Sequence, residues 1–443
     1  MEENTTPETL CEHEMPEKYD DIIAAADDTS GGLTVGFELE VLFPALRRGV
    51  ADPHPFKHGA IYKEGSWDKV IPRHEFEPPD DFEAKFDRWL LDHLQREMPD
   101  GDGFRTENDD VYYPPHDNVP RYDTWRLTKD GSLSYDSGNP SRGSSRLGYA
   151  WMSREITSEV LSSETDGNAN YSTTYAAKIT SICGALRRAR VHLNETTSVH
   201  VHVGRGDDAF SLRAIKKFAA LLWLTDARLL ALQHPAHREN EHCRPVTVES
   251  VLAAKSLEEL RRENSTLGGH VGDDDVVEAQ MMEHLPKLGA ENVLGAQLRR
   301  IWGGNGVEEL ARLMECSERT AVYERGSVGF TRFLPAGKTG GNTHTFEWRH
   351  MAGCLDPEAI VRWARVCIGF TNFARLSDAA TYKTLTTIII QRGDTFTGLD
   401  LLEAIGLQSE ASCFRQQVAD YEQGHLDLFE GQSNGSLFCR PLK

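Results

Sequence analysis

The sequence predicts an α+β fold built on an antiparallel sheet. Short runs of alternating or β-branched residues interleave with amphipathic helical patterns, and hairpin-type turn signals replace a regular strand–helix–strand cadence. The chain has 443 residues, of which 39% are hydrophobic and 26% are charged. This length and composition predict a substantial core with polar insertions, and they permit a single elaborated enzyme domain.

Strands are predicted where apolar and β-branched residues alternate with polar ones. These runs are residues 33–43, 154–161, 197–203, 328–334 and 343–350. A hairpin arm is expected at 125–133, with Asp130-Gly131 as its turn. The last two strands flank a glycine-rich loop and should form a second hairpin.

Helices are predicted where apolar residues recur at helical spacing. These segments are residues 80–98, 170–190, 211–232, a helix opening at Asp356-Pro357, and shorter helices near 399–405 and 409–421. Ser211 is a favoured N-cap residue, and an aspartate followed by proline is typical of a helix start. An acidic loop is expected at Asp273-Asp274-Asp275.

Three regions are predicted along the chain. Residues 1–30 hold ten acidic residues and one basic residue, so residues 1–32 are expected to form a flexible acidic leader. Residues 33–378 would form the main domain, with insertions at 51–125 and 234–290. Residues 379–443 would be a C-terminal helical extension of the same domain.

The net charge limits the classes of partner. Forty-eight Lys and Arg residues against 69 Asp and Glu residues give a formal net charge of −21. A nucleic-acid coat protein or a polybasic membrane binder needs clustered positive charge, so nucleic acid and membrane are not expected as partners. ATP is not excluded, because bound metal ions can neutralise its phosphates.

The chain is expected to be cytoplasmic. No basic segment followed by an apolar run marks a secretory signal, and the longest apolar helical stretch, residues 218–232, is interrupted by Asp226 and Arg228. Eight cysteines form no Cys-x-x-Cys pair. That pattern favours reduced thiols over a disulfide framework or a zinc ribbon.

Three predicted strands each carry two polar residues spaced two apart. Side chains alternate across a strand, so both members of a pair point to one face and their apolar neighbours to the other. The pairs are Glu38 and Glu40, His200 and His202, and Glu347 and Arg349. If these strands share a sheet, its apolar face packs against helices and its opposite face gathers carboxylates, imidazoles and a guanidinium.

Such a face predicts a metal site. Crowded carboxylates repel one another unless cations neutralise them, and oxygen-rich sites suit Mg²⁺, with Mn²⁺ tolerated where histidine takes part. Gly337-Lys338-Thr339 resembles the end of a phosphate-binding P-loop. Its first glycine is replaced by Arg332 and a strand follows, so we interpret the segment as a hairpin loop.

Each pair also has an ordinary structural interpretation. A Glu-x-Glu strand is commonly a solvated face, and Glu-x-Arg can be a cross-strand ion pair. The His-x-His pair is more specific, because valines at positions 199, 201 and 203 flank it. The combination is stronger than any single pair, although its adjacency is an inference from the sequence.

Six motifs follow one another along the chain. They are Gly36-Phe37-Glu38-Leu39-Glu40, Asp130-Gly131-Ser132-Leu133, Glu155-Ile156-Thr157-Ser158, Ser198-Val199-His200-Val201-His202-Val203-Gly204, the loop from His237-Arg238 to Cys243-Arg244-Pro245, and Thr345-Phe346-Glu347-Trp348-Arg349 followed by Cys354-Leu355-Asp356-Pro357. In this order they resemble the motifs of the fungal-type amidoligase family, in the carboxylate–amine ligase group related to glutamine synthetase and glutamate–cysteine ligase. The resemblance runs from about residue 33 to 378.

The resemblance implies a glutamine-synthetase-like fold, a curved antiparallel sheet or half-barrel with helices on its outer face. It also implies the metal ligands Glu38, Glu40, Glu155, His200 and Glu347, around Mg²⁺ (or Mn²⁺) ions that bridge the phosphates of ATP. His202 and Arg349 would contact the nucleotide. Glu159 stands where the family has proline, which leaves open whether it competes with Glu155.

The remaining roles concern the substrates. By the same resemblance, Arg349, Asp130 and His202 are the expected catalytic residues, with Arg349 at the transferring phosphoryl group. Asp130 and Ser132 would lie near the amine. Arg238 and Arg244 would hold a substrate carboxylate or phosphate.

The implied activity is ATP-dependent formation of an amide or peptide-like bond through an acyl phosphate, from a small-molecule or peptide carboxylate and an amine. The two insertions would be lids that exclude water. Two alternatives stay open: a zinc hydrolase using His200 and His202 with Glu155 or Glu347, and a non-catalytic nucleotide-binding relative. The sequence identifies neither the two substrates nor the oligomeric state.

Overall fold

The computed structural model describes most of the chain beyond the leader. The described residues are 31–46, 71–72, 82–98, 103–106, 122–134, 149–163, 174–266, 273–289, 292–316, 325–334 and 344–423. The predicted acidic leader, most of the 51–125 insertion, the glycine-rich loop at 335–343 and the end of the C-terminal extension lie outside these ranges.

The described strands form a single sheet, in which seven strands follow the order β3-β4-β5-β1-β7-β9-β8 and β2 and β6 pair with β1. The strands are β1 (Thr34–Leu46), β2 (Ile71–Pro72), β3 (Phe104–Thr106), β4 (Trp125–Thr128), β5 (Tyr149–Thr157), β6 (Leu161–Ser162), β7 (Ser198–Gly204), β8 (Val328–Gly329) and β9 (Phe346–Ala352). The predicted α+β class is confirmed. The sheet is mixed, however, because β3 pairs with β4 and β1 with β2 in parallel.

Helices make up most of the rest of the described chain. They are α2 (Phe82–Glu97), α4 (Tyr175–Arg188), α5 (Leu212–Leu230), α6 (Val246–Glu249), α7 (Leu257–Asn264), α8 (Asp273–His284), α9 (Val293–Trp302), α10 (Val307–Met314), α11 (Pro357–Leu376), α12 (Ala379–Arg392), α13 (Gly398–Ala404) and α14 (Gln408–Glu422), with 3₁₀ turns η7 (Pro235–Glu239), η8 (Thr331–Phe333) and η9 (Gly393–Thr395). The predicted N-caps are confirmed: the side chains of Ser211 and Asp356 accept from backbone N–H groups of α5 and α11.

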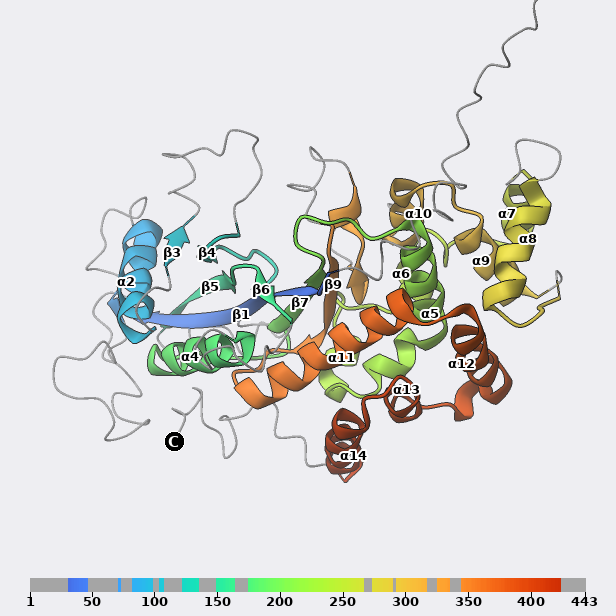
Figure 1. Cartoon of the computed structure of the whole chain (residues 1–443). Coiled ribbons are helices and arrows are strands. Elements are labelled where there is room, and N and C mark those ends of the chain that lie inside the picture. The colour runs from blue at the N-terminus through green and yellow to red at the C-terminus, as the bar shows by residue number, and fades with distance from the viewer. Residues whose placement is uncertain are drawn as a thin grey trace, which may run out of the picture.

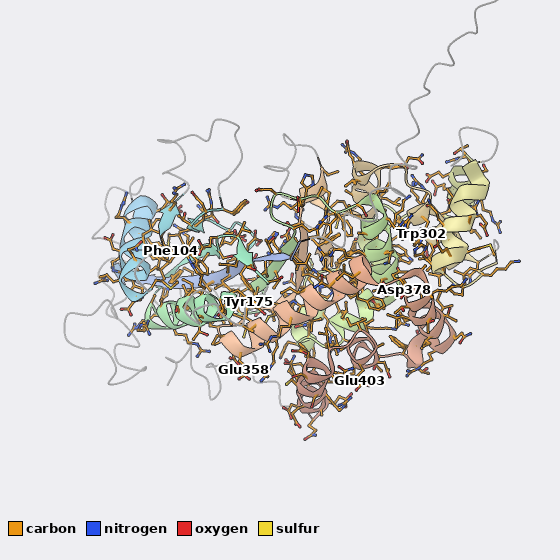
Figure 2. All side chains as sticks on the ribbon, viewed as in Figure 1. Phe104, Tyr175, Trp302, Glu358, Asp378 and Glu403 are labelled. Atoms are coloured by element: carbon orange, nitrogen blue, oxygen red, sulfur yellow. The ribbon has the colours of Figure 1, made fainter. Side chains whose placement is uncertain are left out.

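Helices cover the apolar face of the sheet. In Figure 1, α4 and α11 lie below β1 and β7, and α11 contacts both α4 and β7. Tyr175, labelled in Figure 2 at the start of α4, stacks on Phe37 of β1 with ring centroids 6.2 Å apart. Phe218 of α5 stacks on Phe346 of β9 at 3.6 Å. The apolar residues of the central strands therefore point away from the charged face.

Helix α2, which belongs to the first insertion, also lies on this apolar side. Arg154 of β5 is buried, and its Nε donates to Asp87 of α2 at 2.6 Å. Since Arg154 alternates with Glu155 along β5, α2 packs on the face opposite the charged pairs. Helix α2 is therefore not a lid over that face, and residues 51–70, 73–81, 99–102 and 107–121 of the insertion lie outside the described residues.

Three local expectations differ from the structure. The acidic run at 273–275 begins helix α8 and is not a loop. The strand expected at 328–334 has only two residues, β8, before the chain turns into η8. Asp130-Gly131 is not a two-residue hairpin turn, because β4 pairs with β5 across the longer connection 129–148.

The C-terminal helices pack on the main body. Helix α12 contacts α5 and α8, α13 contacts α5, and α14 contacts α11. The domain boundaries proposed from the sequence stay predictions. None of the described helices has the length and apolar character that a crossing of the bilayer requires.

Candidate active site

The charged pairs of three strands, together with Glu155, lie on one face of the sheet. Strand β1 is central: Glu38 is opposite His200 of β7, and Glu40 is opposite Glu155 of β5. His202 of β7 is in turn opposite Glu347 of β9. The adjacency that the sequence could only suggest is therefore present, and it comes from the register of β5, β1, β7 and β9.

His200 lies at the centre of this face. Its Nδ1 is 2.9 Å from Glu38 Oε2 and 3.5 Å from Glu347 Oε1. Its Nε2 is 2.9 Å from the hydroxyl of Ser198 and 3.5 Å from Glu40 Oε1. Both ring nitrogens are thus engaged by protein groups, and the ring links three strands.

One group of potential metal ligands consists of Glu38, His202 and Glu347, whose nearest ligand atoms lie within 4.8 Å of one another. His202 Nε2 is 3.0 Å from Glu38 Oε1, yet among the described residues this buried nitrogen has no partner in hydrogen-bonding geometry. Its Nδ1 is hydrogen-bonded to Thr345 Oγ1 at 3.2 Å, which fixes the ring. Arg349 forms an ion pair with Glu347 beside this group.

A second group consists of Glu40, Asp130 and Glu155, again within 4.8 Å. The hydroxyls of Thr128 and Thr157 donate to Glu155 at 3.3 and 2.9 Å. The side chain of Ser198 donates to Glu40, and the amide and hydroxyl of Ser132 donate to Asp130 at 2.6 and 2.5 Å. Neutral donors thus orient all three carboxylates, and no arginine or lysine forms an ion pair with them among the described residues.

The two groups differ in electrostatics. Burial alone would raise the pKa of Glu38, but His202 and His200 outweigh it and hold the pKa well below its usual value. Burial would also raise the pKa of Glu347, but the charge of Arg349 outweighs it and lowers that pKa. Burial and the nearby Asp130 raise the pKa of Glu40 well above its usual value, and burial and Glu38 do the same for Glu155. The second group is therefore the one with uncompensated negative charge.

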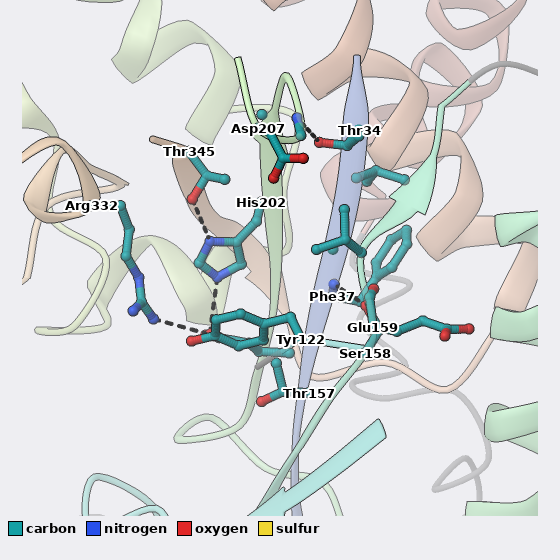
Figure 3. A pocket seen from close by; sticks show the side chains of 16 residues that line it. Thr34, Phe37, Tyr122, Thr157, Ser158, Glu159, His202, Asp207, Arg332 and Thr345 are labelled. Atoms are coloured by element: carbon teal, nitrogen blue, oxygen red, sulfur yellow. Dashed lines mark hydrogen bonds and ion pairs between the residues drawn. The ribbon is translucent and has the colours of Figure 1, made fainter. Parts of the chain in front are cut away.

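A cavity of about 400 Å³ opens beside the first group. Figure 3 shows it between the N-terminal end of β1 and the C-terminal end of β7, with Thr34, Ser158, His202, Asp207 and Thr345 on its walls. This volume is in the range of small-molecule pockets. The cavity reaches Glu38 and His202, so a ligand in it would meet the first group directly.

Sequence reasoning missed two residues of this cavity, Arg332 and Tyr122. The Nη2 atom of Arg332 lies 3.8 Å from Glu38 Oε1, and Figure 3 shows its guanidinium beside the phenol of Tyr122. Burial lowers the pKa of Arg332, but Tyr122 and Glu38 outweigh it and raise the pKa. No motif marks either residue, and Arg332 enters the sequence argument only as a departure from the P-loop pattern.

Glu159 does not compete with Glu155. Its carboxylate forms an ion pair with Lys178 of α4, and it lies at the wall of the cavity rather than in the second group. The backbone of β5 and the following residues turns at Ser158, whose hydroxyl accepts from the amide of Phe37 at 2.9 Å.

Of the two arginines expected at the substrate, Arg238 is engaged away from the carboxylates. Arg238 donates to the carbonyls of Ala231 and Gln233 at 2.7 and 2.9 Å, so its guanidinium is engaged at the end of α5 and not among the carboxylates. Arg244 is closer to the site, because its carbonyl accepts from Ser327 and the Ser327 carbonyl accepts from Arg349. The buried Nε of Arg244 has no hydrogen-bond partner in the described chain.

Comparison with known proteins gives one match. A family model described as "Putative amidoligase enzyme" matches residues 32–269, which is more than half of the chain. Searches of curated proteins and of solved structures gave no match. The matched range includes Glu38, Asp130, Glu155 and both site histidines. Strand β9, with Glu347 and Arg349, follows the matched range and joins the site through its pairing with β7.

Proposed function

The chain belongs to the amidoligase family, and from this premise we propose that it is an ATP-dependent carboxylate–amine ligase that works through an acyl phosphate. The observation that carries the proposal is the shared face of β5, β1, β7 and β9, where five carboxylates, two histidines and Arg349 converge. We further propose that the sheet is a glutamine-synthetase-like half-barrel, since its central strands are antiparallel with helices on one face.

The donor set fits Mg²⁺ or Mn²⁺. The first group offers two carboxylates and the Nε2 of His202, which lies 3.0 Å from Glu38 Oε1, and the second offers Glu40 and Glu155 beside Asp130, with little compensating charge. Oxygen-rich sets of this kind favour hard divalent cations over Zn²⁺. Bound there, Mg²⁺ would neutralise the carboxylates and the phosphates of ATP. His200 would orient Glu38 and Glu40 and could itself provide a ligand after its ring partners rearrange.

The cavity beside the first group is the proposed site for ATP. The phosphates of ATP would meet Glu38, His202 and Glu347 through the cations, and Arg349 would face the phosphoryl group that is transferred. The guanidinium of Arg349 is largely buried, with 18% of the side chain exposed, so its charge acts with little screening by water. Phosphoryl transfer depends mainly on such positioning and charge neutralisation.

The reaction then has two steps. An oxygen of the substrate carboxylate attacks the γ-phosphorus of ATP, ADP leaves, and an acyl phosphate forms. The amine attacks the acyl carbon, phosphate leaves with the former carboxylate oxygen, and the amine loses a proton. We assign Asp130, which is held by Ser132 close to Glu40, as the carboxylate that would attract the ammonium and accept that proton.

A zinc hydrolase fits this geometry less well. His200 and His202 fall outside any common ligand group among the described residues, and both nitrogens of His200 are already engaged. A structural or catalytic zinc site normally takes two or three nitrogen or sulfur ligands at one ion. A site dominated by carboxylates is better matched to phosphate chemistry with Mg²⁺.

The test is release of ADP and phosphate from ATP and Mg²⁺, measured across pools of carboxylates and amines. We expect one pairing to stimulate release, and Glu347→Ala to abolish the stimulation. Glu358→Ala, at an exposed position on α11, is the matched control and should behave as wild type. Stimulated hydrolysis of an amide without ATP would instead support the hydrolase. No nucleotide binding and no release with any pool would contradict the ligase proposal.

A further inference from the structure

Arg332 places a second guanidinium, after that of Arg349, beside the proposed phosphate site. It reaches the cavity from η8, opposite the β1–β7 side, and 18% of its side chain is exposed. Its guanidinium is paired only loosely with Glu38, at 3.8 Å. Figure 3 shows that the group points toward Tyr122 and His202.

The turn that carries Arg332 is held by Glu315. This residue follows α10, and its carboxylate accepts from the amide of Phe330 and also from that of Thr331. Its own backbone is fixed on both sides, because its amide donates to Ala311 at 3.0 Å and its carbonyl accepts from Val251 at 2.8 Å. Glu315 therefore anchors the first residues of η8, one or two positions before Arg332.

We propose that Arg332 is a catalytic residue that contacts the phosphates of ATP, an inference that rests on the proposed function. Glu315 is then the positioning residue that holds Arg332 there through η8. The ligand class is a polyphosphate with its divalent cation. Each of the two site arginines then lies beside a carboxylate. Arg349 forms an ion pair with Glu347, and Arg332 lies 3.8 Å from Glu38. Glu38 and Glu347 both belong to the first metal-ligand group.

This arrangement gives each arginine two partners. Without cations, Glu38 and Glu347 are the counter-ions of the two guanidiniums. When a divalent cation takes these carboxylates, their charge is shared and both guanidiniums can turn to phosphate oxygens, for which arginine has a well-matched bidentate geometry.

The first experiment measures equilibrium binding by calorimetry, with Mg²⁺ and a non-hydrolysable ATP analogue. Arg332→Ala should weaken binding about 10-fold or more, the usual scale for a lost charge-assisted hydrogen bond, and Arg332→Lys should recover part of it. Binding of adenosine, which has no phosphates, should be unchanged. Arg312→Ala, an exposed arginine on α10 paired with Glu308, is the control and should bind as wild type.

The second experiment separates positioning from folding. Glu315→Gln keeps an oxygen that can accept from the Phe330 amide, so it should bind the analogue nearly as wild type, whereas Glu315→Ala should reproduce the loss seen in Arg332→Ala. The double variant with alanine at both positions should be no weaker than Arg332→Ala alone, because the two changes remove one interaction. Glu308→Ala is the exposed control on α10, the helix that precedes Glu315.

The outcomes distinguish this inference from the proposed function. If wild type binds the analogue with Mg²⁺ and Arg332→Ala binds equally well, Arg332 has no phosphate contact and only this inference is wrong. If Glu315→Ala loses binding that Glu315→Gln does not recover, or if the double variant shows two additive losses, Glu315 does not act through η8. If wild type binds no nucleotide, the ligase proposal fails together with it.

Discussion

His237 Nε2 lies 3.0 Å from the backbone carbonyl oxygen of Arg349. The segment after α5 therefore holds the strand that carries the site arginine, although His237 contributes no side chain to the charged face. Burial lowers the pKa of His237 to about 4, and its bond to Arg349 offsets this only in part. The imidazole is thus neutral over the physiological range, and its Nε2–H donates a hydrogen bond to the carbonyl.

We expect this residue to make the fold acid-sensitive. In the unfolded chain His237 titrates near the usual histidine value of 6.5, and in the folded protein at about 4. Between these values the unfolded state binds the extra proton, so the free energy of unfolding falls as pH drops from about 6.5 to 4. One such group changes it by at most about 1.4 kcal/mol per pH unit.

The measurement is denaturant unfolding from pH 7.5 to 4.5. His237→Gln keeps a donor for the Arg349 carbonyl and cannot be protonated, so its unfolding free energy should fall less steeply with acid than that of wild type. His242→Gln, at a partly exposed neighbouring position, is the control. Equal slopes for wild type and His237→Gln would contradict this assignment.

Glu40 should cost stability when no cation is bound. Its pKa is raised well above the usual value by burial and by Asp130. The carboxyl group therefore ionises less easily in the folded protein than in the unfolded chain, and the free energy of unfolding falls as pH rises above the unfolded pKa. Glu40→Gln removes the charge and keeps an acceptor for Ser198. At pH 8 without divalent cations, we therefore expect the variant to have a higher free energy of unfolding than wild type.

The same variant should lose the response to Mg²⁺. A cation that binds only the folded protein raises its stability by mass action. Addition of about 10 mM Mg²⁺ should therefore raise the melting temperature of wild type but not that of Glu40→Gln. Glu403→Gln, exposed on α13, should respond as wild type. A variant that is less stable than wild type without Mg²⁺ would show that Glu40 is a structural acceptor and not a strained ligand.

The fold was partly predictable because its signals are local. Ser211 and Asp356 fix helix starts through their own side chains, and alternation along β1 and β7 separates the charged face from Phe37 and Val201. The parallel pairing of β3 with β4 was not predictable, because β3 has only three residues and is too short to show an alternating pattern. The Asp-rich start of α8 was misassigned since acidic residues suit both loops and first turns of helices.

The candidate site was also only partly predictable from the sequence. Paired residues on one strand, such as Glu38 and Glu40, can be recognised by spacing alone. Arg332 and Glu315 cannot, because their roles arise from η8 and from the end of α10, and neither has a spacing that differs from ordinary polar sequence. Arg238 shows the opposite error: a charged residue in a motif-like loop is engaged by carbonyls at the end of α5.

Asp226 is a buried carboxylate that joins several elements behind the site. In the sequence it only interrupts an apolar helix, but in the structure it is fully buried and accepts from the Val246 amide at 2.6 Å and from Ser327 at 2.7 Å. His350 Nε2 lies 2.8 Å from it. Asp226 therefore ties α5 to α6, β8 and β9 from behind the charged face.

Asp226→Asn should destabilise the protein by about 3 kcal/mol or more, the scale of breaking a buried charged network by removing one partner. The amide cannot accept all these bonds and brings two donors that the site does not match. Denaturant unfolding measures the loss, and Asp420→Asn, on the exposed side of α14, should be within about 0.5 kcal/mol of wild type. A near-neutral Asp226→Asn would mean that the network contributes little.

Arg349→Lys tests the chemistry at its centre. Lysine keeps a positive charge near Glu347 but loses the planar guanidinium that can bind two phosphate oxygens at once. Burial opposes the charge of Arg349, yet Glu347 and Glu38 raise its pKa, so the arginine is held charged for contact with phosphate. We expect the stimulated rate of ADP release to fall about 100-fold, as for loss of one transition-state stabiliser, with the melting temperature little changed. Arg362→Lys, on α11 and paired with Glu358, should retain the wild-type rate. If Arg349→Lys also keeps that rate, the arginine serves only as the counter-ion of Glu347, and the phosphoryl group must be stabilised by other residues of the site.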